Sequence, residues 1–258
     1  MLHERPQVLV IAGLDPSGGA GIQADIQAIT AMGCHPLPVI SCLTVQDTVN
    51  VLGSEAVDAQ LIRRQLQALK ADCPIHAIKT GALGNAAVVQ VLAEFLAQMP
   101  GVPLVLDPVI KAAGGGELAD ESLWCTMRDH LFPLADLLTP NGPELCQLGD
   151  SDNTEGAVAR LMQTGCGAIL ATGGHGKEAL ISNRLYQPGQ PVQTWQLPRV
   201  GGEYHGSGCT LAAAISAGMA KGQSLPAAIE AAQTFVAGSI EHALQVGRGQ
   251  PVPDRVAR

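Results

Sequence analysis

The stretch that decides the fold reads His205-Gly-Ser-Gly-Cys-Thr210 and continues as Leu-Ala-Ala-Ala-Ile-Ser-Ala-Gly-Met-Ala-Lys221. Its second half is rich in alanine, with apolar residues at helical spacing, and predicts a helix. Gly206 and Gly208 interrupt the first half and predict a loop that leads into the helix N-terminus. The first amides of a helix lack acceptors within the helix and lie at the positive end of its dipole. The stretch therefore predicts a site for an anion.

Cys209 lies at the mouth of this predicted site, and two interpretations of it stay open. A helix N-terminus favours thiolate over thiol and lowers the pKa of a cysteine, so Cys209 is a candidate base or nucleophile beside a bound anion. A cysteine at a helix start can equally be buried and inert. His205 and Cys209 are four residues apart and could share a metal ion, but no further ligand cluster in the sequence supports such a site.

The composition argues against several classes of protein. The 258 residues carry a net charge of −8, and aromatic residues make up only 3%. We therefore expect no nucleic-acid partner, because such partners favour a basic surface and aromatic stacking. The seven cysteines are scattered without a Cys-x-x-Cys pair, which favours free thiols and a cytoplasmic location. The apolar run at residues 8–12 is too short for a signal sequence or a membrane span, so we expect no membrane partner.

Apolar runs and amphipathic stretches alternate along the chain. Short apolar runs indicate buried parallel strands, and they are found at residues 8–12, 37–42, 75–79, 104–106, 134–138 and 168–172. Helices are expected at 22–32, 58–70, 86–99, 154–164, 209–221 and 225–246, and short antiparallel strands at 179–182, 184–186 and 192–197. The pattern predicts one α/β domain spanning residues 1–258, with a mainly parallel sheet and helices on both faces.

Polar or glycine-rich residues follow the predicted strands at the points where they end. In open α/β sheets, ligands bind outside the carboxyl ends of the strands, so these residues are expected to converge on one crevice with the helix start at Cys209. They are Gly13, Gln46, Thr80, Asp107, Asn141 and Gly173.

Carboxylates in this crevice suggest a cation site. Asp107 and Glu144 could hold Mg²⁺, which prefers few carboxylates together with phosphate oxygens. Other interpretations remain: Asp107 could end its strand in a turn, and Asn141 and Glu144 could cap the next helix. Asp25 could stabilise the dipole of its own helix from the first turn. An anion site, hydrated Mg²⁺ and a base together are typical of phosphoryl transfer.

Seven segments carry a resemblance to a known family. They are residues 12–25 (AGLDPSGGAGIQAD), 43–48 (LTVQDT), 79–84 (KTGALG), 106–109 (LDPV), 139–144 (TPNGPE), 173–175 (GGH) and 205–210 (HGSGCT). In this order they resemble the hydroxymethylpyrimidine/phosphomethylpyrimidine kinases of thiamine biosynthesis, in the ribokinase-like superfamily. The resemblance covers nearly the whole chain. It implies a three-layer ribokinase-like fold, ATP and Mg²⁺ as cofactors, a small pyrimidine as substrate, and a homodimer.

The resemblance also implies roles for individual residues. The aminopyrimidine would be contacted by Gly13, Asp25 and Gln46 and lined by Ala82 and Val109. ATP would be bound by Asn141, Thr172 and Gly174, and Mg²⁺ by Asp107 and Glu144. The anion hole would consist of Gly206, Ser207, Gly208 and Cys209, with Cys209 also acting as base near the hydroxymethyl oxygen.

The chain departs from the family pattern at three places, and rival functions stay open. Many members have Lys where this chain has Thr172, Met where it has Ala82, and Lys-Asn-Thr where it has Gly202-Glu203-Tyr204. A sibling kinase that acts on a pyridoxal-type ring or a sugar is one alternative. A non-catalytic pyrimidine-binding module is the other.

Overall fold

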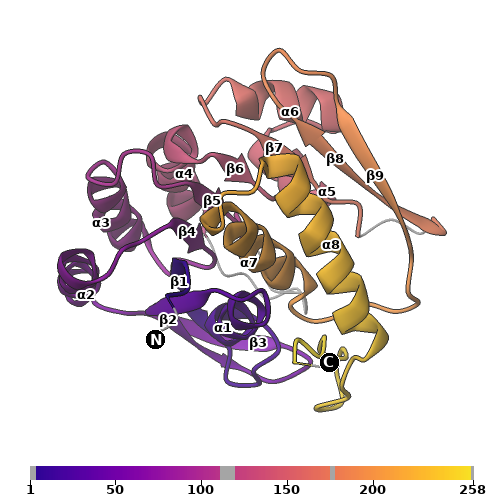
Figure 1. Cartoon of the computed structure of the whole chain (residues 1–258), viewed down its shortest axis with the longest axis horizontal. Coiled ribbons are helices and arrows are strands. Elements are labelled where there is room, and N and C mark those ends of the chain that lie inside the picture. The colour runs from indigo at the N-terminus through magenta and orange to yellow at the C-terminus, as the bar shows by residue number, and fades with distance from the viewer. Residues whose placement is uncertain (1–3, 111–119, 175–177, 257–258) are drawn as a thin grey trace.

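The computed structural model describes residues 4–110, 120–174 and 178–256, and one nine-stranded sheet runs through it (Figure 1). The strand order is β3-β2-β1-β4-β5-β6-β7-β8-β9. The six strands from β2 to β7 in this order are parallel, and β3, β8 and β9 pair antiparallel at the two edges. The mainly parallel sheet of the prediction is confirmed, with its antiparallel strands confined to the margins.

The strands of the central part are short and buried. In chain order the sheet consists of β1 (Gln7–Leu14), β2 (His35–Gln46), β3 (Val51–Ala56), β4 (Ala77–Thr80), β5 (Leu104–Leu106), β6 (Leu137–Leu138), β7 (Ile169–Ala171), β8 (Leu180–Tyr186) and β9 (Gln193–Pro198).

The helices lie on both faces of the sheet. They are α1 (Gly21–Ala31), α2 (Ala59–Asp72), α3 (Ala86–Leu96), α4 (Glu121–His130), α5 (Gly142–Leu148), α6 (Thr154–Met162), α7 (Ser207–Ala220) and α8 (Leu225–Glu241), with a short 3₁₀ turn at Phe132–Leu134. None of the helices in the described ranges is long and apolar enough to span a membrane.

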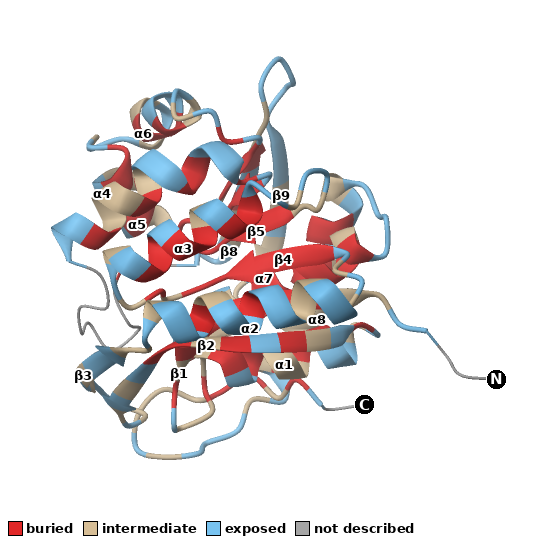
Figure 2. Ribbon diagram, turned by 90° about the vertical axis from the view of Figure 1, so that its left-hand side faces the viewer, coloured by how far each residue is buried: buried red, intermediate tan, exposed pale blue. Residues whose placement is uncertain are grey.

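Alternate residues of each central strand enter different cores. In β1, Leu9 and Ile11 pack with α2 and α3, whereas Val8 and Val10 pack with α1 and α7. This alternation follows from the period of two in a strand, and it requires both faces to be covered. Figure 2 shows the result: buried residues fill the strands and the inner sides of the helices, and exposed residues cover the outer sides of α2 and α3. The two faces together give the predicted three layers.

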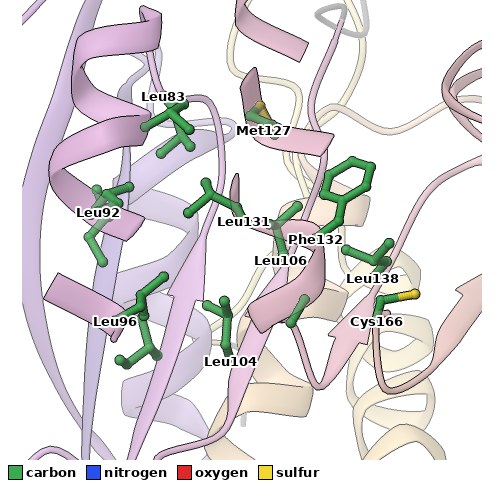
Figure 3. Packing of buried hydrophobic residues seen from close by; sticks show 14 of the residues in the cluster. Leu83, Leu92, Leu96, Leu104, Leu106, Met127, Leu131, Phe132, Leu138 and Cys166 are labelled. Atoms are coloured by element: carbon green, nitrogen blue, oxygen red, sulfur yellow. The ribbon is translucent and has the colours of Figure 1, made fainter. Parts of the chain in front are cut away.

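The larger core lies under α3 and α4. Leu92 and Leu96 of α3 face Leu104 and Leu106 of β5, and Phe132 closes the far side (Figure 3). Burying one such side chain stabilises the fold by about 1.5–3 kcal/mol, so this cluster holds β5, and with it the carboxyl end of that strand, in place. The residue at that end is Asp107.

The structure differs from the sequence pattern at four places. Of the strand predicted at 134–138, only Leu137–Leu138 forms a strand, because Leu134 belongs to the preceding 3₁₀ turn. Residues 179–182 and 184–186 form one strand, β8, because Asn183 stays in the ladder and turns its buried side chain to Gly173 and Gln233. β3 and α4 were not predicted at all. The α8 helix ends at Glu241 and not near residue 246. His175 of the glycine segment lies outside the described residues.

Candidate active site

A cavity of about 540 Å³ opens at the carboxyl ends of β1, β4, β5 and β6. β1 lies between β2 and β4, so the strand that follows β1 in the chain pairs with one of its edges and β4 pairs with the other. Such a switch in strand order is the usual place for a ligand crevice in an open α/β sheet. Four of the six residues that were expected to converge line this cavity together with Cys209, namely Gly13, Gln46, Asp107 and Asn141, whereas Thr80 and Gly173 do not. Every predicted site residue except Asp25 lines this cavity: Gly13, Gln46, Ala82, Asp107, Val109, Asn141, Glu144, Thr172, Gly174, Gly206, Ser207, Gly208 and Cys209.

The N-terminus of α7 forms one wall of the cavity. Gly206 is the N-cap, with φ +82°, and a Cβ at this position would lie 2.0 Å from the carbonyl oxygen of Gly19. Only glycine fits both constraints. Helices α2 to α6 each begin with a side-chain cap, whereas α7 has none. Within the described ranges, the amides of Ser207, Gly208 and Cys209 have no acceptor, so they remain available to an anion.

The loop between β1 and α1 is folded around Asp15. One carboxylate oxygen accepts from the Ser17 amide at 2.8 Å, and the other accepts from the Ala20 amide at 2.9 Å. His205 Nε2 lies 2.7 Å from the second oxygen and ties this loop to the start of α7. Although burial works in the opposite direction, the hydrogen bonds from His205 and Ser17 hold the pKa of Asp15 well below its ordinary value. Asp15 is therefore an ionised carboxylate whose hydrogen bonds connect two walls of the cavity.

Asp25 lies beneath the cavity and not in its wall. Its Oδ2 accepts a 2.9 Å hydrogen bond from Lys79 Nζ, and both side chains are completely buried. Asp25 also lies beyond the first turn of α1, which has no acidic residue, so the helix-dipole interpretation is wrong. Burial raises the pKa of Asp25 to about 6, with Lys79 opposing that shift. Lys79 does line the cavity, so Asp25 can act on a ligand through it.

Asn141 and Glu144 cap α5, as one of the two sequence interpretations expected. The Asn141 side chain accepts from the Glu144 amide at 2.9 Å, and Glu144 Oε2 accepts from the Asn141 amide at 3.0 Å, which is a complete capping box. Both residues also line the cavity, so capping and ligand binding are compatible. Burial, and then the charge of Asp107, raise the pKa of Glu144 to about 8.

Asp107 lies next to this capping box at the end of β5. Its Oδ1 is 3.4 Å from the hydroxyl of Thr139, which follows β6. Burial raises the pKa of Asp107 in spite of the attraction of Lys79. The protein therefore compensates negative charge on the carboxyl groups of Asp107 and Glu144 only in part, and it favours a proton on Glu144 at neutral pH.

The expected acidity of Cys209 is wrong for the ligand-free protein. The thiol lies at the N-terminus of α7, as predicted, and it is partly exposed to the cavity. Burial raises its pKa to about 12, and although Lys79 favours the thiolate, Asp107 and Asp25 oppose it. Desolvation and two nearby carboxylates thus outweigh the helix dipole. Cys209 is a protonated thiol at neutral pH.

The cavity has two ends that differ in character. Gly13, Gln46, Ala82 and Val109 surround a small end beside β2, and a Cβ on Gly13 would lie 2.7 Å from the sulfur of Cys42. The other end lies against β9 and α8 and is lined by apolar side chains of Leu197, Val200, Val236, Ala237 and Ile240.

Thr172 and Gly174 connect the two ends. The Thr172 amide donates to the Pro140 carbonyl at 3.1 Å, which places the residue after β7 beside the start of α5. Arg199 Nη1 donates to the Gly174 carbonyl at 2.7 Å and connects Gly174 to the residue that follows β9. The two-ended cavity is suited to two different ligands that meet near α7.

The comparison with known families accounts for this arrangement. A family model described as phosphomethylpyrimidine kinase matches residues 15–253. The chain belongs to this family. The hydroxymethylpyrimidine/phosphomethylpyrimidine kinase of Haemophilus influenzae is 36% identical over 252 residues, and the match covers 94% of each chain.

Solved structures agree with membership of the phosphomethylpyrimidine kinase family. The phosphomethylpyrimidine kinase of Clostridium difficile superposes with a TM-score of 0.79 at 28% identity, covering 91% of this chain and 99% of that one. An ADP complex of Bacillus subtilis pyridoxal kinase superposes with a TM-score of 0.89 at 27% identity, covering 98% of both chains. The ribokinase-like fold is thus confirmed.

Sequence reasoning about this member of the phosphomethylpyrimidine kinase family missed Lys79 and Asp15 as site residues. Both occur in the motifs that were singled out, but no role was given to them. A lysine at the end of an apolar run was the available signal for Lys79, because a buried ammonium requires a partner. Asp15 offered no comparable signal, since its partners come from its own loop and from His205, 190 residues away.

Proposed function

We propose that the protein transfers the γ-phosphoryl group of ATP to 4-amino-5-hydroxymethyl-2-methylpyrimidine, and then a second phosphoryl group to the resulting monophosphate. The product would enter thiamine diphosphate biosynthesis. One observation carries the proposal: the unpaired amides at the start of α7 and the thiol of Cys209 share a cavity with the Gln46 end on one side and an apolar end on the other. The names of the relatives support the choice of substrate.

The small end of the cavity is the proposed site of the pyrimidine. Gln46 has an amide that can both donate and accept, so it can pair with a ring nitrogen and the adjacent amino group. Gly13, Ala82 and Val109 leave room for a flat ring. Asp25 would act from below, by holding Lys79 in place.

ATP is the proposed ligand of the opposite end. The apolar side chains of β9 and α8 offer a surface for the base. Asn141, Thr172 and Gly174 line the path from there to the start of α7 and would contact the nucleotide. In this arrangement the γ-phosphoryl group reaches the amides of residues 207–209.

The donor set fits Mg²⁺ bound together with the nucleotide. Within the described ranges, no group of three or more His, Cys, Asp or Glu side chains is arranged to hold a metal ion alone. Mg²⁺ in phosphoryl-transfer sites uses one or two carboxylates plus phosphate oxygens and waters, which Asp107 and Glu144 can provide. The raised pKa values of both carboxyl groups support this proposal, because a bound cation would stabilise their ionised forms. When bound, Mg²⁺ neutralises charge on the phosphates.

Charge stabilisation by α7 is the main contribution of the protein to the reaction. The hydroxymethyl oxygen attacks the γ-phosphorus, the bond to the β-phosphate oxygen breaks, and ADP leaves. Amides fixed in advance at Ser207, Gly208 and Cys209 stabilise the equatorial oxygens during transfer. Cys209 would take up the hydroxyl proton late and as a thiolate, after its own proton had been lost to solvent, since the transition state is loose and demands little from a base.

A substrate screen tests this proposal against its main rival. The close superposition with pyridoxal kinase makes a pyridoxal-type ring the second candidate substrate. We expect ADP formation with hydroxymethylpyrimidine and with its monophosphate, and much less with pyridoxine or ribose. Turnover of pyridoxine alone would contradict the proposal. Thermal stabilisation by the pyrimidine without any ADP formation under Mg·ATP would instead indicate a binding module.

We also propose that the protein is a cytoplasmic homodimer. The edge hairpin of β2 and β3 exposes large apolar side chains, with Val45 61% and Leu52 75% exposed, and such surfaces mark interfaces. All seven cysteines are free, in keeping with a reducing compartment. Light scattering should give twice the chain mass of 26.6 kDa. Leu52→Asp should shift the mass toward that of the monomer, and a wild-type monomer would rule the dimer out.

A further inference from the structure

The segment after α8 returns to the active site and contains a buried arginine, Arg255. Leu244 and Val252 pair through two hydrogen bonds of 2.8 and 2.9 Å, and the Pro251 carbonyl accepts from the His205 amide at 2.9 Å. In Figure 1 this segment lies beside the lower end of α8. Arg255 is only 2% exposed, and among the described residues it is the largest whose side chain is fully buried. A guanidinium in that position needs an explanation, because arginine is almost never buried without partners.

Arg255 joins the two glycine segments that form the cavity wall. Its Nη2 donates to the Gly19 carbonyl of the β1–α1 loop at 2.5 Å, and its Nε donates to Thr210 Oγ1 of α7 at 2.7 Å. Thr210 Oγ1 in turn donates to the Gly206 carbonyl at 2.7 Å. The Nη1 of Arg255 donates to Oε1 of Gln27 in α1 at 3.2 Å. One side chain thus spans α1, the loop before it and the N-cap of α7.

The charge of Arg255 is balanced only at longer range. Among the residues that the structure describes, Arg255 forms no ion pair within 4.0 Å, and its hydrogen-bond acceptors are neutral. Asp15, Asp25, Asp254 and Cys209 are near enough to influence it. Arginine keeps its proton in proteins, so a positive charge lies directly behind the N-cap of α7.

From this geometry we infer that Arg255 is a positioning residue for phosphoryl transfer. Its planar fork fixes the start of α7 against the β1–α1 loop, so that the amides of residues 207–209 are already aimed at the transferring group. Such fixed donors stabilise charge without reorganising during the reaction, and this raises turnover more than substrate affinity. The inference rests on the proposed function, because it assumes that an anion binds at α7.

Kinetics of three variants test the inference. Arg255→Gln should lower kcat roughly tenfold to a hundredfold, as expected when hydrogen bonds from a charged group are lost, while KM for the pyrimidine stays near the wild-type value. Arg255→Lys should also lower kcat, because an ammonium cannot span three acceptors. Arg248→Gln, an exposed arginine of the same segment, is the matched control and should behave as wild type. All assays are run below the unfolding temperature of each variant.

A purely structural role gives a different result. In that case Arg255→Gln would unfold at a lower temperature but keep wild-type kcat where it is folded, and the inference would be overturned. If Arg255→Gln does not fold, Arg255→Lys decides the question, and wild-type kcat for that variant overturns the inference.

Inorganic phosphate separates failure of the inference from failure of the proposed function. No ADP formation by the wild-type protein would count against the function alone. The unfolding temperature of wild-type protein should then still rise with phosphate, and that of Arg255→Gln should rise less. An equal rise in both proteins would show that Arg255 does not organise the anion site.

Discussion

The ammonium of Lys79 lies 2.9 Å from the carboxylate of Asp25, and neither side chain has any exposed surface. Attraction to the carboxylates of Asp25 and Asp107 outweighs burial and raises the pKa of Lys79, so the Lys79–Asp25 pair is ionised at neutral pH. An ion pair in this position connects β4 to α1 directly under the cavity. It costs desolvation energy, which suggests that it serves the site more than the fold.

Replacing one partner of this pair should be far more harmful than replacing both. Asp25→Asn leaves a buried ammonium without a counter-charge and should lower the free energy of unfolding by about 3–5 kcal/mol. The double variant Asp25→Asn with Lys79→Met removes both charges and should recover much of that loss. Urea denaturation measures both. Equal losses in the single and double variants would show that the two residues do not interact.

Cys209→Ala should lower turnover and leave pyrimidine binding nearly unchanged. As a thiolate, Cys209 would accept the hydroxyl proton, and loss of a general base lowers the rate by roughly 10²-fold. Cys73→Ala, at the end of α2, serves as the control. Steady-state kinetics with the pyrimidine distinguish the two effects. A Cys209→Ala enzyme with wild-type kcat would exclude the thiol as the proton acceptor.

Gln46→Ala should act mainly on binding. The ring edge would lose its partner, and an unpaired polar group costs about 1–3 kcal/mol, which corresponds to a KM that is roughly 5- to 160-fold higher. Gln67→Ala on the exposed side of α2 is the matched control. An unchanged KM for the pyrimidine would place the substrate elsewhere.

Glu144 should make the metal-free protein less stable as the pH rises. Its pKa is about 8 in the folded protein and 4.5 as the ordinary value, so between these limits the folded state binds more protons than the unfolded state. Stability therefore falls from about pH 5 to pH 8. Glu144→Gln can keep the capping box and should flatten this decline. Thermal unfolding with a chelator present measures it, and identical pH profiles for both proteins would refute the assignment.

The layered fold was predictable because its strands are short apolar runs. Because both faces of the sheet are buried, there are few polar residues in β1, β5 and β7, and each strand is recognisable in the sequence as an apolar run. Parallel pairing then brings the carboxyl ends of these strands to the same edge of the sheet. The edge strand β3 was not predictable in the same way. Its residues are mostly exposed or half-buried, and its apolar pattern is correspondingly weak.

Interactions between residues that are far apart in the chain could not be predicted from the sequence. The pKa of Cys209 depends on Asp107 and Asp25, whose distances from the sulfur are set by three different elements. Local reasoning could see only the helix dipole, and it gave the wrong direction. Arg255 is similar, because nothing in the last residues of the chain indicates that they return to Gly19 and Thr210.

A crystal structure with Mg·ADP and hydroxymethylpyrimidine tests the central claim most directly. We expect the pyrimidine beside Gln46, its hydroxymethyl oxygen facing the sulfur of Cys209, and the terminal phosphate of ADP directed toward the amides of residues 207–209. Ligands bound away from the start of α7, with the sulfur of Cys209 packed against apolar side chains, would contradict the proposed site.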